Sequence, residues 1–287
     1  MAKATRHTFK GQTSVEAVLE KADLNWTAEP QPLITGAGIS VESHKAIVRD
    51  DSNSIIGIVG KGYEPIQNSH AFSFMDTICE KFGAQYEYCY SIDNGSKMIM
   101  QAKMTEKFEV RPGDVIQQYI TGINSFNGTT PLRAYFTPIR MFCDNQCRAS
   151  LRAATEAVSI RHTKNALSYV EEAFRVFGMG VEYFEAFQEQ AQHLAQKAVD
   201  GKMVDKFLRE CMGEPDSTRR QNQFDEVTAL FEHGKGNNGS SAWDLYNGIT
   251  EYVDHHRGKN ADSRLASAMT GQGSTLKAKA FSVAMAL

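Results

Sequence analysis

Basic residues are concentrated in one part of the chain, between Arg133 and Arg175. This stretch holds seven lysines and arginines against four aspartates and glutamates, although the whole chain has a formal net charge of -3. Cationic groups gathered in one place can neutralise phosphates. The sequence therefore predicts a nucleic-acid-binding surface, whose candidate residues are Arg133, Arg140, Arg148, Arg152, Arg161, His162 and Lys164. The alternative is a solvated helix face whose arginines pair with nearby carboxylates.

A second candidate site is the triplet Asp254-His255-His256, whose residue types also occur in metal-dependent phosphoesterases. Such enzymes take further Asp and His ligands from strand ends, and no companion HxD or DxD motif precedes the triplet. It also stands at the end of a predicted helix, where His255, His256 and Arg257 favour the negative end of the helix dipole. We therefore favour a polar helix terminus over a metal site.

No other pattern in the chain predicts catalysis or a cofactor. Cys143 and Cys147 lie four residues apart, with His162 as a conceivable third ligand, but zinc sites normally show closer pairs and four ligands, so two buried thiols are preferred. The glycine-rich segment 234–241 does not match GxxxxGK[ST], and the chain lacks a GxSxG elbow and a GxGxxG loop after a strand. These observations favour a non-catalytic protein without a cofactor. The glycine, asparagine and serine content of segment 234–241 predicts a flexible loop.

Composition narrows the class of protein. The 287 residues, 41% hydrophobic and 23% charged, are typical of a soluble globular protein with one large domain or two ordinary ones. The apolar runs are shorter than the roughly 20 residues that a membrane helix needs. Five cysteines and an N-terminus without an apolar signal core indicate a reducing, cytoplasmic setting.

Hydrophobic periodicity predicts an α+β fold, in which an antiparallel sheet flanked by helices precedes a mainly helical C-terminal half. Residues 32–59 are typical of a β-meander, and residues 68–82 have apolar residues at helical spacing before Gly83. A hairpin is expected around Asp93-Asn94-Gly95-Ser96, followed by two strands and a helix. We expect one α+β domain over residues 1–150 and a helical region over 151–287, which ends in a basic tail that is a mobile arm or a helix that orders on a partner.

Three tyrosines alternate along the first strand of that hairpin: Tyr86, Tyr88 and Tyr90. Because side chains of a strand alternate between its two faces, the three are expected on one face of the sheet. They either pack under a helix, which we favour, or form a platform on which bases stack.

Blocks spread along the chain resemble the phage/plasmid-like protein family, a domain of unknown function found on phages, plasmids and related mobile elements. The resemblance extends from about residue 15 to 258 and is carried by Leu24-Asn25-Trp26, Val48-Arg49-Asp50, Gly62-Tyr63-Glu64-Pro65, Pro138-Ile139-Arg140, Ile160-Arg161-His162-Thr163 and Glu251-Tyr252-Val253-Asp254-His255. The chain departs from the pattern at Asp144 and Gln146-Cys147. The resemblance implies a mobile-element setting in a bacterial cell and leaves the activity open.

The order helix, antiparallel sheet, basic helix is also similar to that of single-strand annealing proteins, which assemble into rings or filaments; this is an analogy of architecture alone. The leading hypothesis is a non-catalytic, oligomeric protein that binds single-stranded DNA in phage or plasmid replication or recombination. One alternative is an interaction or counter-defence protein that binds a host factor through its helical half. The other is a metal-dependent nuclease that uses Asp254, His255 and His256.

Overall fold

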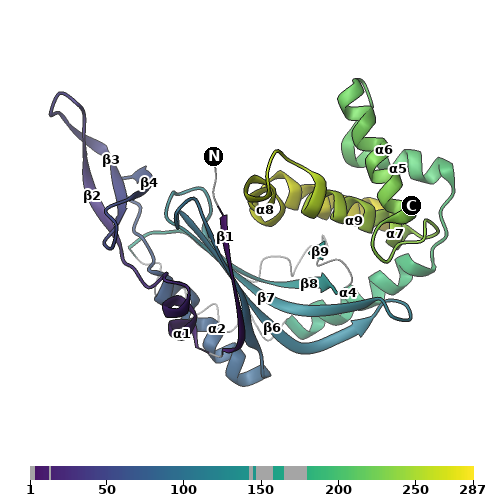
Figure 1. Ribbon diagram of the computed structural model, residues 1–287, viewed down its shortest axis with the longest axis horizontal. Coiled ribbons are helices and arrows are strands. Elements are labelled where there is room, and N and C mark those ends of the chain that lie inside the picture. The colour runs from purple at the N-terminus through teal and green to yellow at the C-terminus, as the bar shows by residue number, and fades with distance from the viewer. Residues whose placement is uncertain (1–3, 13, 142–144, 147–157, 165–179) are drawn as a thin grey trace. The chain divides into compact units, whose positions relative to one another are not determined.

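The computed structural model describes residues 4–12, 14–141, 145–146, 158–164 and 180–287. Its architecture is α+β, with two antiparallel sheets followed by a mainly helical C-terminal half (Figure 1). This confirms the fold class expected from the sequence.

The larger sheet has seven strands in the order β1-β5-β6-β7-β8-β10, with β9 also paired to β8. Its strands are β1 (Ala4–Gln12), β5 (Gln85–Ile92), β6 (Lys97–Glu109), β7 (Val115–Ser125), β8 (Leu132–Arg140), β9 (Asn145–Gln146) and β10 (Val158–Ile160). The β5–β6 hairpin turns where the sequence predicts it, because Asp93, Asn94 and Gly95 all adopt the positive φ that the tight turn requires.

Two helices precede this hairpin, α1 (Val15–Lys21) and α2 (Asn68–Phe82), and α2 ends at Gly83 in the left-handed conformation. The helix α2 packs on one face of the sheet. A Cβ atom at Gly122 on β7 would lie 2.9 Å from Phe72 and 3.0 Å from Met75, so only glycine allows this close approach. Tyr86 on β5 donates a hydrogen bond of 2.6 Å to Asp76 on α2.

The predicted β-meander is a separate three-stranded sheet in the order β2-β3-β4, formed by β2 (Ala28–Ile34), β3 (Ser40–Arg49) and β4 (Ile55–Gly60). Gly57 packs against the loop after β7, where a Cβ would lie 2.2 Å from the carbonyl oxygen of Phe126. The other side of the sheet is partly apolar and open, since Ile55 and Ile58 are more than half exposed.

The C-terminal half is built from α4 (Gly180–Gln196), α5 (Gly201–Met212), α6 (Thr218–His233), α7 (Ala242–Glu251), the π-helical turn η2 (Tyr252–His256), α8 (Ala261–Thr270) and α9 (Gln272–Ala286). Its core is aromatic: Phe281 on α9 stacks on Phe187 at 5.6 Å and meets Tyr246 edge-on at 5.2 Å. The C-terminal tail, which the sequence predicted to be a mobile arm or a helix that orders on a partner, therefore belongs to this core.

Contacts between Cα atoms divide the chain into two compact units that interleave along the sequence. The first comprises Met1–Thr105, Tyr119–Phe136 and Glu156–Gly180, and the second comprises Glu106–Gln118, Thr137–Thr155 and Val181–Leu287. These limits differ from the division expected at residue 150, because the strands β6, β7 and β8 each contribute to both units.

Candidate nucleic-acid interface

Arg140, at the end of β8, is completely buried in the second unit. Its Nε and Nη2 atoms each donate a hydrogen bond of 2.6 Å to Asp114, which is itself only 2% exposed. Asp114 also accepts a hydrogen bond of 3.0 Å from the indole Nε1 of Trp243. A guanidinium held in this way cannot reach a phosphate, so the prediction that Arg140 contacts nucleic acid is wrong.

The same guanidinium fixes the segment that follows α6. Arg140 donates to the carbonyl oxygens of Lys235 and Gly236 and to the side chain of Asn237, at 3.1, 2.7 and 2.8 Å. Arg111 pairs with Asp244 and also donates to Gly236. Segment 234–241, expected to be flexible from its composition, is instead tied to the sheet by these hydrogen bonds.

His162 is also unsuited to binding a phosphate. Its ring is 6% exposed and stacks on Tyr63, with the ring centroids 4.8 Å apart. Neither ring nitrogen has a hydrogen-bond partner among the residues that the structure describes. Burial lowers the pKa of His162 to about 4, so the imidazole is neutral at pH 7 and contributes no positive charge. Its predicted role as a phosphate contact is therefore wrong.

Three other predicted cations lie at one edge of the larger sheet, in the first unit. Arg133 on β8 is half-buried and lies opposite Ser159 on β10, while Arg161 and Lys164 follow directly after β10 and are exposed. Lys97, the first residue of β6, lies close to Arg133: burial lowers its pKa and the charge of Arg133 lowers it further, whereas the carboxylate of Asp93 raises it. We call these four residues, Lys97, Arg133, Arg161 and Lys164, the cation group.

Two predicted contacts, Arg148 and Arg152, lie outside the described residues, as do Cys143 and Cys147. Lys97 was missed by the sequence analysis because it stands alone beyond the hairpin turn. Only the antiparallel pairing of β5, β6, β7 and β8 brings it near the basic stretch that begins at Arg133. The signal available in the sequence was a lysine at the first position of a strand.

The predicted tyrosine row is divided between the two faces of the sheet. The pairing of β5 with β6 shifts register between Tyr86 and Tyr88, so Glu87 is an extra residue. As a result Tyr86 points toward α2, whereas Tyr88 stacks against Tyr119 on the other face, with the ring centroids 6.1 Å apart. The side chain of Arg6 on β1 covers Tyr88 at 4.2 Å. The expectation that all three tyrosines share a face is wrong.

The candidate metal ligands do not converge on a common point. Asp254 is paired with the buried Lys277 at 2.7 Å, and His256 lies 3.0 Å from Glu226. Throughout the described part of the chain, no three His, Cys, Asp or Glu side chains are placed to hold a metal ion. Asp254, His255 and His256 belong to the π-helical turn η2, which packs against α8 and α9.

Comparison with known proteins gives a family. Residues 55–278 match the model of a domain of unknown function, DUF932. The chain belongs to the DUF932 family. The matched region includes α2, most of the larger sheet and the C-terminal helices, and thus both the cation group and the Arg140–Asp114 pair. No curated protein and no solved structure matches the chain. Among the described residues, no helix has both the length and the apolar character to cross a membrane.

Proposed function

We propose that this DUF932 protein binds nucleic acid without catalysing a reaction, and that the cation group contacts the phosphates of a single strand. The observation that carries the proposal is the closeness of Lys97 and Arg133, two like charges held together at a partly buried site. Their mutual repulsion raises the free energy of the charged state, and a phosphate oxygen between them would lower it. Asp93 offsets part of this repulsion, because its charge raises the pKa of Lys97 while burial and Arg133 lower it.

Two features make the site suitable for a polymer of phosphates rather than a single anion. Arg161 and Lys164 are exposed and follow β10, the strand that pairs with β8 at Arg133, so further cations are available at this edge of the sheet. The chain as a whole is slightly acidic, so attraction must come from such a local group. The proposed interface has fewer residues than the sequence predicted, because Arg140 and His162 are buried.

The resemblance to phage/plasmid-like proteins supports a role in the replication or recombination of mobile elements, in the cytoplasm of a bacterial host. The architectural analogy with single-strand annealing proteins supports a homo-oligomer and single-stranded DNA as the partner. The nuclease alternative loses its support, because Asp254 and His256 are engaged with Lys277 and Glu226.

The test is fluorescence anisotropy with a labelled single-stranded DNA over a range of salt concentrations. The variant Arg161→Glu/Lys164→Glu changes only exposed residues and should raise Kd at low salt at least about tenfold. Affinity for single strands falls with log salt at a slope of roughly 0.7 per phosphate contact, so the loss of two contacts should reduce the slope by about 1.4. The same assay with an RNA strand compares the two nucleic acids.

The matched control is Lys206→Glu/Lys259→Glu, which alters net charge equally at exposed positions of the other unit. It should bind DNA like the unmodified protein. Absence of binding at low salt, or an equal loss in both variants, would show that the cation group is structural and would overturn the proposal.

A further inference from the structure

A small pocket with a volume of about 250 Å³ lies in the second unit, where α5, α6, the turn η2 and α9 meet. Two arginines line it, Arg220 on α6 and Arg257 directly after η2, and both are half-buried. Among the described residues that line this arginine pocket, none is an aspartate or a glutamate. Because its charged groups are cations, the arginine pocket is suited to an anion.

The guanidinium of Arg257 lacks part of its hydrogen bonding. Its Nη1 atom is buried and has no hydrogen-bond partner among the described residues. Its Nη2 atom donates to the side chain of Gln272, which also lines the pocket, at 3.3 Å. A buried donor without an acceptor lowers stability, and the cost is larger for a charged group. An anion in the pocket would give this guanidinium the acceptor that the fold does not supply.

Arg220 is held at the pocket by the segment that precedes α6. Its Nη1 atom donates a hydrogen bond of 3.2 Å to the carbonyl oxygen of Glu214, and its Nε atom lies 3.7 Å from Asp216. A Cβ atom at Gly213 would lie 2.8 Å from Nη1, so a larger residue there would displace the guanidinium. Asp216 is 69% exposed, and an ion pair so open to water contributes little. A second guanidinium is therefore available to an anion.

Tyr252 adds a neutral donor to the lining of the pocket. Burial raises the pKa of its hydroxyl and the charge of Glu226 raises it further, whereas Arg257, Arg219 and a hydrogen bond from Gln223 lower it. Since the net shift of this pKa is upward, the hydroxyl keeps its proton at pH 7 and can donate a hydrogen bond. The influence of Arg257 on this pKa also shows that the two groups lie near each other.

We propose that the arginine pocket binds the phosphate group of a small organic phosphate. A phosphate has enough acceptor oxygens for both guanidinium groups and the Tyr252 hydroxyl, and hydrogen bonds between charged partners are the strong ones. Met212 and Leu276 supply apolar surface for the organic part of the ligand. The volume is below the roughly 300 to 1,000 Å³ of pockets for drug-sized ligands, which limits the occupant to a small molecule.

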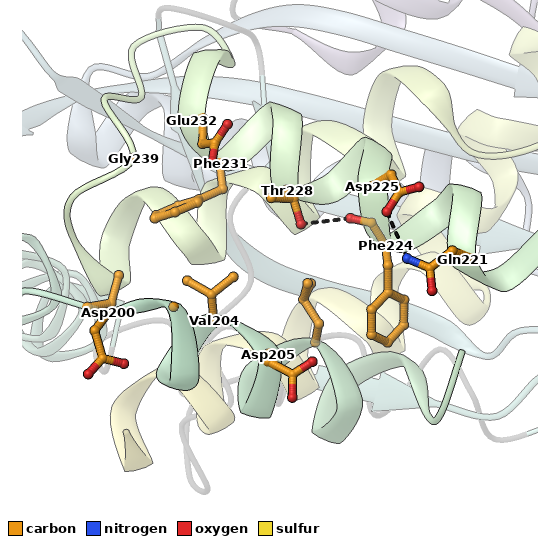
Figure 2. A pocket seen from close by; sticks show the side chains of 13 residues that line it. Asp200, Val204, Asp205, Gln221, Phe224, Asp225, Thr228, Phe231, Glu232 and Gly239 are labelled. Carbon is orange, nitrogen blue, oxygen red and sulfur yellow. Dashed lines mark hydrogen bonds between the residues drawn. The ribbon is translucent and has the colours of Figure 1, made fainter. Parts of the chain in front are cut away.

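A second hollow between α5 and α6 carries charge of the opposite sign. Its lining includes Asp200 and Asp205, from the N-cap and the body of α5, and Asp225 and Glu232 from α6 (Figure 2). Carboxylates repel a phosphate, so of these two hollows only the arginine pocket suits an anion. The arginine pocket shares no residue with the cation group, which belongs to the first unit.

Isothermal titration calorimetry on the full chain tests the proposal with two probes, inorganic phosphate and glycerol phosphate, and with acetate for comparison. We expect both phosphates to bind, and acetate to bind at least about tenfold more weakly because it has fewer acceptor oxygens. Arg257→Gln and Arg220→Gln should each raise the Kd of the phosphates at least about tenfold, since each change removes a charged hydrogen-bond donor.

The matched control variant is Arg219→Gln, which removes the same charge from an exposed residue of α6 outside the pocket lining. It should change the Kd of the phosphates by less than about twofold, because water and salt screen a charge that does not touch the ligand. Absence of phosphate binding, equal binding of acetate, or an equal loss in the Arg219→Gln variant would overturn the proposal.

The same variants separate a small phosphate from the phosphates of a nucleic acid. Arg257→Gln should leave the affinity for single-stranded DNA unchanged, and a loss of that affinity would assign the pocket to the nucleic-acid interface and overturn the proposal. Circular dichroism shows whether each variant is folded. The comparison of phosphate with acetate uses the unmodified protein and so does not depend on the folding of any variant.

Discussion

Arginines of the basic stretch differ in their burial and hydrogen bonding because their neighbours in the fold differ. Arg140 lies where two carboxylate oxygens and two backbone carbonyls converge, so its charge is fully used inside the fold. Arg161, which follows the short edge strand β10, remains exposed. Burial of a charged group is tolerated only where it is paired and hydrogen-bonded. The burial of a side chain and its partners therefore decide which cations of a basic stretch can meet a ligand.

His162 makes the stability of the fold depend on pH. Its pKa is about 4 in the folded protein and near 6.5 in the unfolded chain, so the unfolded chain binds the proton first. The stabilising contribution is complete above pH 6.5 and is lost as the pH falls from 6.5 to 4. Between pH 7 and pH 5 the unfolding free energy should decrease by about 2 kcal/mol on account of this residue.

The measurement is urea unfolding at pH 7 and pH 5 for the unmodified protein and for His162→Phe. Phenylalanine keeps the stacking on Tyr63 but cannot be protonated, so the variant should lose the part of the pH dependence that His162 supplies. His233→Phe is the control, because His233 is 82% exposed and should contribute little. If the two variants show the same pH dependence, His162 is not the titrating group.

At the level of elements, local signals predicted the fold well. The positive-φ turn at Asp93-Asn94-Gly95 and the helix end at Gly83 each depend on a few neighbouring residues, and each is where the sequence predicted it. The candidate site was harder to predict, because it depends on pairings between distant residues. One extra residue in β5, Glu87, places Tyr86 on the opposite face of the sheet from Tyr88. Arg140, at the end of β8, pairs with Asp114, which lies between β6 and β7. Hydrophobic periodicity predicts neither this extra residue nor the pairing of Arg140 with Asp114.

The pair Arg140–Asp114 is expected to hold the α6–α7 segment against the sheet. Asp114→Leu leaves the buried guanidinium without its carboxylate and should lower the unfolding free energy by roughly 3 to 5 kcal/mol. Arg140→Met should lower it less, because Asp114 keeps Arg111 at 3.6 Å as a second cation. The double variant should cost about 0.5 to 3 kcal/mol less than the sum of the two, because no unpaired charge remains. Urea unfolding of the four proteins gives this coupling energy.

Hydrogen exchange supplies a local measure of the same effect. Loss of Arg140 removes its hydrogen bonds to Lys235, Gly236 and Asn237 and leaves Gly236 with the donor from Arg111 alone, so amide exchange over residues 234–241 should become faster. The exposed pair Lys206–Glu210, 3.8 Å apart, is the control, and its removal should change stability by less than about 0.5 kcal/mol. A coupling energy near zero for Arg140 and Asp114 would mean that the pair does not act as a unit.

For the whole molecule, charge is divided between the two compact units. The first unit carries the cation group and the second carries the exposed acids Asp200, Asp205, Asp225 and Glu232, although the net charge of the chain is only -3. A net value near zero thus conceals two local fields of opposite sign. At physiological salt these fields are screened over about 8 Å, so each ligand should respond to the charges that it touches and not to the sum over the chain.

A variant with compensating charge changes on the two units tests this view directly. Arg161→Glu and Lys164→Glu lower the net charge by four, and Asp225→Lys and Glu232→Lys raise it by four, so the combined protein keeps the original net charge of -3. We expect it to lose affinity for single-stranded DNA as fully as the Arg161→Glu/Lys164→Glu variant. Recovery of DNA binding in the combined variant would instead show that net charge, and not the cation group, attracts the nucleic acid.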